Sequence, residues 1–171
     1  MSIDTAAGTD ISEPSAATVA AVHSLLFREA RLLDTHSYVE WLSLWTPGEL
    51  LYWVPGAGDP SLDGVPSIVL DDRSDLEDRT ERLAEGWAMA HYSSISLCRS
   101  ITNIEVETVD ADQLIVHSVL DLTEIRDERR YHWTGRVRHE LRVTADGLAI
   151  AVKRVDLVDR HLATPVLAFL L

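Results

Sequence analysis

The side chains that could perform acid–base or metal chemistry are spread thinly along this chain of 171 residues. Its 7 histidines stand far apart, at positions 23, 36, 91, 117, 132, 139 and 161. His132 and His139 lie seven residues apart, so on one regular strand their side chains would face opposite ways. An iron site of two histidines and one carboxylate needs two histidines that converge. The spacing therefore predicts no metal site in this chain.

Proton transfer is the other chemistry that these residue types allow. His117 and Asp121 share one face of a predicted strand because their spacing is even, and Tyr52 stands on another strand. Together with His139, they could serve as acids and bases in a cavity. The plainer interpretation places His117 and Asp121 as ordinary strand residues. We favour it, because spacing along one sequence does not show that four side chains converge.

Sequence motifs of common enzyme classes are missing. The chain has no glycine-rich phosphate loop, no dinucleotide-binding fingerprint, no Gly-x-Ser-x-Gly and no His-Glu-x-x-His. We therefore expect no cofactor-binding site in this chain. A group of aromatic residues could line a ligand pocket, but its spacing on two adjacent elements favours packing in the core. The group comprises Tyr38, Trp41, Trp45, Tyr52 and Trp53.

The composition is that of a soluble globular domain, with 46% apolar and 25% charged residues. Asp and Glu total 28 and Lys and Arg 15, which gives a formal net charge of −13. Such a chain repels phosphate backbones, which argues against nucleic-acid binding. No apolar run approaches the roughly 20 residues that span a bilayer. The acidic N-terminal segment is unlike an export signal and Cys98 is the only cysteine, so we expect a cytoplasmic protein without membrane contact.

The elements that must position these side chains follow from the hydrophobic pattern. Apolar residues at spacings of three and four predict a helix over 16–34, and a shorter helix is predicted over 36–45. Ser74 and Glu77 have the spacing of a capping box, so a third helix is expected to begin at Ser74 and to run to 85–90. Strands are expected over 50–54, 67–70, 101–109, 113–123, 131–143 and 148–158, with turns at 110–112 and 146–147.

Helices followed by an antiparallel meander predict an α+β fold, with helices packed on one face of a curved sheet. Residues 1–15 are small and polar and are expected to form a flexible tail, which leaves 16–171 as a single domain. The apolar residues 166–171 are expected to dock on the core or on a partner.

The predicted strand 131–143 has one apolar face and one strongly polar face. Six of the 15 basic residues, all of them arginines, fall within 126–142. Arginine pairs with carboxylates through two parallel hydrogen bonds, a geometry suited to subunit interfaces. We therefore expect either a solvated strand face or an interface. The candidate interface residues are Arg136, Arg138 and Arg142, with Asp72, Asp75 and Asp78 as possible counterparts.

Several blocks of the sequence are similar to one known family. The most specific block is Asp71-Asp72-Arg73-Ser74-Asp75-Leu76-Glu77-Asp78-Arg79. The other blocks, in the same order as in that family, are Phe27–Asp34, Glu40–Leu44, Tyr52–Pro55, Arg99–Ile104 and Lys153–Asp159. The chain thereby resembles the small (beta) subunit of aromatic-ring-hydroxylating dioxygenases, the Rieske non-heme iron oxygenases.

The resemblance implies a cone-shaped α+β fold of the nuclear transport factor 2-like or cystatin-like kind. It also implies a large alpha subunit as partner, which would hold a Rieske [2Fe-2S] cluster and a mononuclear Fe(II), while this chain holds no cofactor. The beta subunits would self-associate as a trimer within an α3β3 hexamer and scaffold the catalytic subunits in aromatic compound catabolism. The substrate pocket would then lie mainly in the other chain.

A stand-alone enzyme of the same fold is the alternative hypothesis. It would be a dehydratase or isomerase acting on a small hydrophobic molecule by acid–base catalysis. Its acids and bases would be drawn from Tyr52, His117, Asp121 and His139.

Overall fold

The computed structural model describes residues 13–58, 66–86, 95–162 and 166–171, and every structural statement below concerns these residues. Three helices precede or interrupt the sheet: α1 (Ala16–Asp34), α2 (Tyr38–Leu42) and α3 (Arg73–Ala84). The strands are β1 (Leu51–Pro55), β2 (Ser67–Asp71), β3 (Ile95–Thr108), β4 (Gln113–Arg126), β5 (Arg129–Thr144) and β6 (Gly147–Leu157). Most of the predicted flexible tail lies outside the described residues.

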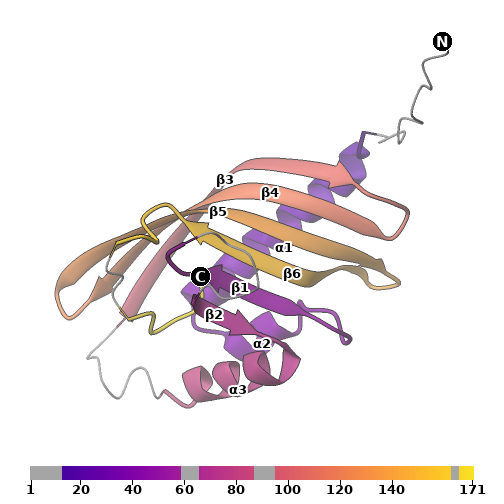
Figure 1. Cartoon of the computed structure of the whole chain (residues 1–171). Helices are drawn as coiled ribbons and strands as arrows, with labels where there is room; N and C mark the ends of the chain where they lie inside the picture. The colour runs from indigo at the N-terminus through magenta and orange to yellow at the C-terminus, as the bar shows by residue number, and fades with distance from the viewer. Residues whose placement is uncertain (1–12, 59–65, 87–94, 163–165) are drawn as a thin grey trace, which may run out of the picture.

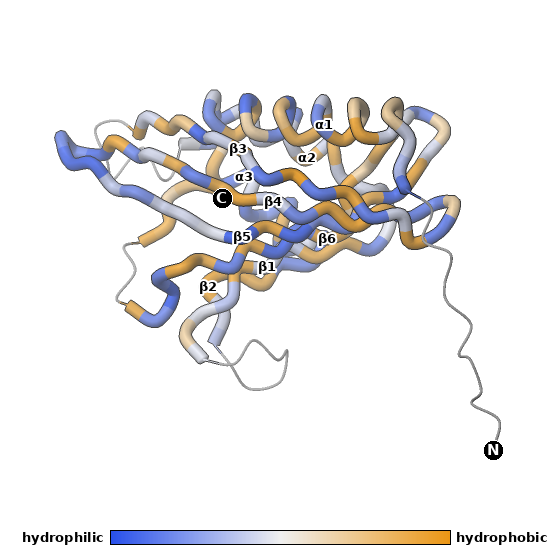
Figure 2. Tube along the Cα trace, turned by 90° about the horizontal axis from the view of Figure 1, so that it is seen from above, coloured by the Kyte–Doolittle hydropathy of each residue, from blue (hydrophilic) through white to orange (hydrophobic). Residues whose placement is uncertain are grey.

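All the strands form one sheet in the order β2-β1-β6-β5-β4-β3. The long strands β3 to β6 make the predicted antiparallel meander. Strand β1 pairs with β6 in parallel, so the sheet contains one parallel pair that the sequence did not predict. Figure 1 shows the long strands bending across the molecule, and Figure 2 shows α1 as a separate layer along one face. The predicted α+β fold with a curved sheet is confirmed.

The core lies between α1 and the face of the sheet that α1 covers, which we call the inner face. Helix α1 buries Val22 and Leu26 there, as its three-and-four spacing predicts. Strand β5 alternates in burial along its length, and Trp133, Val137 and Leu141 point inward. Each such side chain contributes about 1.5–3 kcal/mol when fully buried. The opposite face, which we call the outer face, holds the polar residues of the same strands.

The apolar segment 166–171 docks on this core, which confirms one of the two expected outcomes. Residues Ala168 to Leu171 are buried. The backbone N–H of Leu171 donates to the hydroxyl of Tyr52 at 2.9 Å, and the guanidinium of Arg99 donates to the carbonyl of Leu170. Polar side chains of β1 and β3 thus hold the backbone of this segment inside the molecule.

The second helix is shorter than the predicted range 36–45. His36 has a positive φ of 56°, so helical geometry begins only after it. After Leu42 the chain turns toward β6: Thr46 N–H donates to the carbonyl of Ile150 at 2.8 Å, and Ile150 N–H donates to that of Leu44 at 2.9 Å. Pairing with a strand therefore replaces the last turns of the predicted helix.

The predicted cap at Ser74 is wrong. Helix α3 begins at Arg73, and Asp72 is the N-cap, because its carboxylate accepts from the backbone N–H of Asp75 at 3.0 Å. The helix also ends earlier than predicted, at Ala84, where Gly86 takes a positive φ of 79°.

The start of β3 and the turn between β4 and β5 differ from the predicted boundaries. Strand β3 begins at Ile95 instead of 101, because Arg99 is an inward-facing strand residue whose charge is paired with Asp34 of α1. Strands β4 and β5 continue into a tight turn at Asp127 and Glu128, both with positive φ. Neither residue is the Asn or Gly that usually indicates such a turn.

The corrected cap leads to a stability prediction. Asp72→Ala should lower the free energy of unfolding by about 0.5–2 kcal/mol, because the Asp75 N–H loses its acceptor. Ser74→Ala is the matched control and should change the urea midpoint little. A larger loss for Ser74→Ala than for Asp72→Ala would contradict the assignment of the cap.

Candidate functional site

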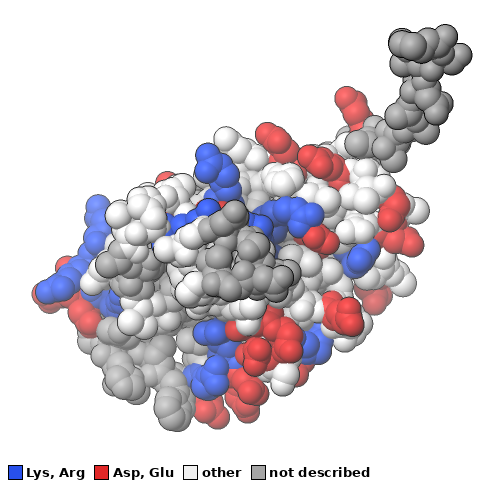
Figure 3. Space-filling view, viewed as in Figure 1, with Lys and Arg blue, Asp and Glu red and all other residues white. Residues whose placement is uncertain are grey.

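The outer face of the sheet holds the predicted interface arginines. In the strand register, Arg138 of β5 lies between His117 of β4 and Arg154 of β6, so basic side chains stand in a row. Arg136 lies opposite Asp156, but Asp156 is paired with Arg154 at 2.7 Å and with a second arginine. Arg136 therefore makes no ion pair with a described residue. Figure 3 views the molecule from this side and shows basic side chains over the middle of the sheet.

A second charged surface lies over α3 and is mainly acidic. Asp72, Asp75 and Asp78 are all exposed there. Two arginines of this region pair with acidic residues of the same chain. Arg79 bonds to buried Asp71, with one N–O distance of 2.9 Å, and Arg73 pairs with Glu77 at 3.1 Å. The predicted arginines and acids make no ion pair with each other among the described residues. They form two separate surfaces of one chain.

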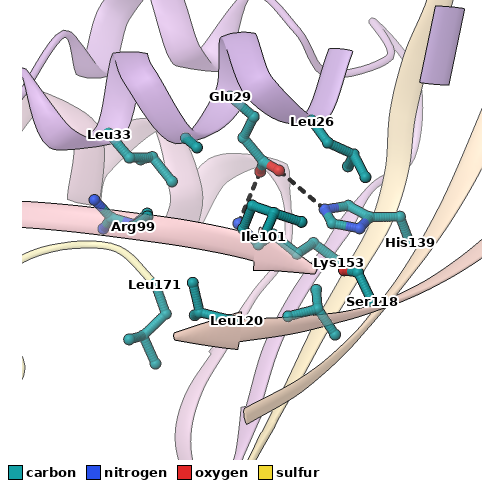
Figure 4. A pocket seen from close by; sticks show the side chains of 12 residues that line it. Leu26, Glu29, Leu33, Arg99, Ile101, Ser118, Leu120, His139, Lys153 and Leu171 are labelled. Atoms are coloured by element: carbon teal, nitrogen blue, oxygen red, sulfur yellow. Dashed lines mark hydrogen bonds and ion pairs between the residues drawn. The ribbon is translucent and has the colours of Figure 1, made fainter. Parts of the chain in front are cut away.

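A cluster of charged residues in the core was not predicted (Figure 4). Glu29 of α1 accepts hydrogen bonds at 3.0 Å from His139 Nε2 of β5 and at 2.8 Å from Lys153 Nζ of β6. It also accepts one from Trp41 Nε1 of α2 at 3.2 Å. Glu29, His139 and Lys153 are 3%, 2% and 4% exposed. The buried carboxylate is satisfied by donors from three different elements, which is the condition for a charge to be tolerated in a core.

Burial and charge act in opposite directions on the pKa of Glu29. Burial raises the pKa, but the charges of Lys153 and His139 and the hydrogen bonds from both residues outweigh burial and hold it well below the ordinary 4.5. For Lys153, burial is the larger effect and lowers the pKa, although Glu29 opposes it. Glu29 is therefore a carboxylate at neutral pH, which makes it a hydrogen-bond acceptor on both oxygens.

The signal for this cluster was present in the sequence. Glu29 lies three residues after Leu26 and four before Leu33, on the apolar stripe of the first helix. Lys153 has the same strand parity as buried Val155 and Leu157. A charged residue at a position that must face the core requires a buried partner.

The four residues of the alternative hypothesis are divided between the two faces. Tyr52 and His139 lie inside, where burial raises the pKa of Tyr52 above its ordinary range. His117 and Asp121 lie on the outer face, with side chains 45% and 49% exposed, and Asp121 pairs with His132 at 3.4 Å. The structure does not bring the four together.

Aromatic side chains predicted to pack in the core do so. Trp41 and Tyr52 meet edge to face with ring centroids 6.0 Å apart, and Trp45 packs against both. Trp53 lies apart from this cluster, with Arg154 over its ring at 4.3 Å.

Metal and membrane features are not found in the described part of the chain. No group of three His, Cys, Asp or Glu side chains there could hold a metal ion. No described helix is both long enough and apolar enough to cross a bilayer.

The buried cluster predicts a strong, non-additive effect on stability. Glu29→Gln leaves Lys153 as an unpaired buried charge, so it should cost about 3–5 kcal/mol. Lys153→Met should also destabilise the fold strongly, because Glu29 then loses its ammonium partner and keeps only the bonds from His139 and Trp41. The double variant should lose much less than the sum of the two. Denaturant titration of the wild type, the two single variants and the double variant measures these free energies of unfolding. Additive losses would show that the two charges do not interact.

Low pH should remove the stabilisation that the Glu29 carboxylate provides. Glu29 titrates near 4.5 in an unfolded chain and well below that in the fold, so its contribution is complete above pH 4.5 and is lost as the pH falls below it. Unfolding free energy should then drop by up to about 1.4 kcal/mol per pH unit more in the wild type than in Glu29→Gln. If the unfolding free energies of the two proteins changed equally with pH between about pH 6 and about pH 3, this prediction would be wrong.

Comparison with known proteins identifies the family. The family model described as "Ring hydroxylating beta subunit" matches residues 28–164. The small subunit of 2-halobenzoate 1,2-dioxygenase from Burkholderia cepacia is 32% identical over 142 residues, which cover 80% of this chain and 86% of that subunit.

Solved structures agree in fold. A chain of naphthalene 1,2-dioxygenase with bound indole superimposes with a TM-score of 0.79 at 20% identity, over 94% of this chain and 89% of that chain. The beta subunit of benzoate 1,2-dioxygenase from Burkholderia mallei superimposes with a TM-score of 0.72 at 26% identity, over 85% and 94% of the two chains. This chain therefore belongs to the family of beta subunits of ring-hydroxylating dioxygenases.

Proposed function

We propose that this chain is the structural, non-catalytic beta subunit of a multicomponent aromatic-ring-hydroxylating dioxygenase. The observation that carries the proposal is the family match across 28–164, which spans nearly the whole domain 16–171. It binds a large alpha subunit that holds the Rieske [2Fe-2S] cluster and the mononuclear Fe(II). It acts in the cytoplasm, without nucleic acid or membrane.

The packing around Glu29 supports a structural role. The buried acid–base groups are bonded to one another, and the cavity beside them measures about 10 Å³, room for a single water molecule. The alternative, a stand-alone dehydratase or isomerase, has less support because Tyr52 and His139 lie on the opposite face from His117 and Asp121.

The charged surfaces support a ring of beta subunits. In a ring with threefold symmetry, each subunit presents two different surfaces to its two neighbours. The outer-face arginines Arg136, Arg138 and Arg142 are one such surface, and the exposed acids Asp72, Asp75 and Asp78 over α3 are another. Complementary charge on two separate surfaces suits head-to-tail contact between copies, within a hexamer of three alpha and three beta subunits.

Purification of a tagged chain from its host, with identification of the chains that come with it, tests the function. The expected result is a complex whose second chain contains Cys-x-His and Cys-x-x-His motifs and whose iron is found only when that chain is present. The beta chain purified alone should hold no stoichiometric iron or zinc. Iron near one atom per isolated beta chain, or dehydratase activity of the isolated chain, would contradict the proposal.

Charge reversal tests the interface. Arg136→Glu with Arg138→Glu should leave the fold intact, because the first side chain is exposed and the second about one-third exposed. At an interface the same change should cost several kcal/mol of assembly free energy, because like charges are brought together. Arg129→Glu with Arg130→Glu, at the exposed turn between β4 and β5, is the matched control. Light scattering reports assembly and far-UV circular dichroism reports folding. If the chain with Arg136→Glu and Arg138→Glu formed a normal hexamer, those arginines would face solvent and the interface assignment would be wrong.

A further inference from the structure

The cavity in the core lies between α1 and the inner face of the sheet (Figure 4). Leu26, Leu120 and Val137 form apolar parts of its wall. Two polar side chains in the same wall, Ser118 of β4 and His139 of β5, are 4% and 2% exposed.

Each of these two side chains has an atom without a hydrogen-bond partner among the described residues. The atoms are the hydroxyl oxygen of Ser118 and Nδ1 of His139. A buried polar atom that loses water without gaining a partner destabilises the fold, so such atoms in a folded core point to a ligand that pairs with them. Both atoms belong to the lining of one cavity.

The strand register places the two side chains close enough to share one small ligand. Ser118 lies directly opposite Val137, and His139 is two residues further along β5 on the same inner face. They are therefore diagonal neighbours across two paired strands, a spacing that a single bridging molecule can span.

The polar atoms of the wall define what that ligand must do. His139 Nε2 lies 3.0 Å from the carboxylate of Glu29, which can only accept, so Nε2 donates there and Nδ1 is the atom left for the ligand. The Ser118 hydroxyl can donate or accept. Arg99 Nε, a donor in the same wall, also lacks a partner among the described residues. A ligand that can both donate and accept hydrogen bonds suits this set of atoms.

We propose that this cavity is a binding site for one ordered water molecule, which hydrogen-bonds with His139 Nδ1 and with the Ser118 hydroxyl. Water is both donor and acceptor, and the cavity volume of about 10 Å³ fits one molecule. The water extends the Glu29 cluster, which already joins α1, α2, β5 and β6, to strand β4.

A high-resolution crystal structure of the full chain, alone or in its complex, tests the site directly. The expected result is one solvent peak about 2.7–3.2 Å from both Ser118 Oγ and His139 Nδ1. A direct hydrogen bond between Ser118 and His139, with no peak between them, would overturn the proposal. So would a peak with a shape larger than one water.

Nitrogen-15 spectra of the histidine rings give an independent readout. The wild type should show a protonated Nε2 and a hydrogen-bonded Nδ1 on the His139 ring. Ser118→Ala should shift the Nδ1 resonance and remove the solvent peak or reduce its occupancy, whereas Ser100→Ala, an exposed serine of the neighbouring strand β3, should do neither. A wild-type Nδ1 resonance without the signature of a hydrogen bond would overturn the proposal even if Ser118→Ala failed to fold.

Discussion

The interaction on which the rest of the structure depends is the buried carboxylate of Glu29. Helix α1 crosses the inner face of a curved sheet, and an apolar helix surface alone permits many positions along such a face. Hydrogen bonds to His139, Lys153 and Trp41 are directional, so they fix where α1 lies on β5 and β6 and where α2 lies beside it. The cost of burying the charge is offset only when all these donors are in place, which makes the arrangement specific.

Alternation along the long strands gives the sheet a packed inner face and a charged outer face. Inward positions are used for packing, for the Glu29 cluster and for Arg99, which joins Asp34 to the backbone of Leu170. Outward positions hold arginines, including Arg136 with no ion pair among the described residues. A beta subunit that supports catalysis elsewhere is consistent with this division, because the buried Glu29, His139 and Lys153 bond to one another while the outer face presents charged side chains.

Periodicity predicted most of the fold, since period two and period three-to-four patterns are properties of the chain itself. The alternation of β5 was predicted, and so were Val22, Leu26 and Leu33 of the buried stripe of α1. The start of β3 was missed because Ser96, Cys98 and Arg99 look like a polar loop until Asp34, far away in sequence, is seen to pair with Arg99. Glu29 and Lys153 were missed because their partner in each case is on another element. The role of Arg136 and Arg138 stays a prediction, because it depends on a second chain.

The parallel pairing of β1 with β6 has a consequence for the order of folding. Strand β1 is made early in synthesis, yet its neighbour in the sheet is the last strand of the meander. Until β6 emerges, β1 and β2 have an unpaired edge and Tyr52 and Trp53 lack most of their packing. Such long-range pairing slows folding and leaves an aggregation-prone intermediate. We therefore expect the yield of soluble chain to depend on slow synthesis or on chaperones, and the β1–β2 hairpin not to fold as a separate unit.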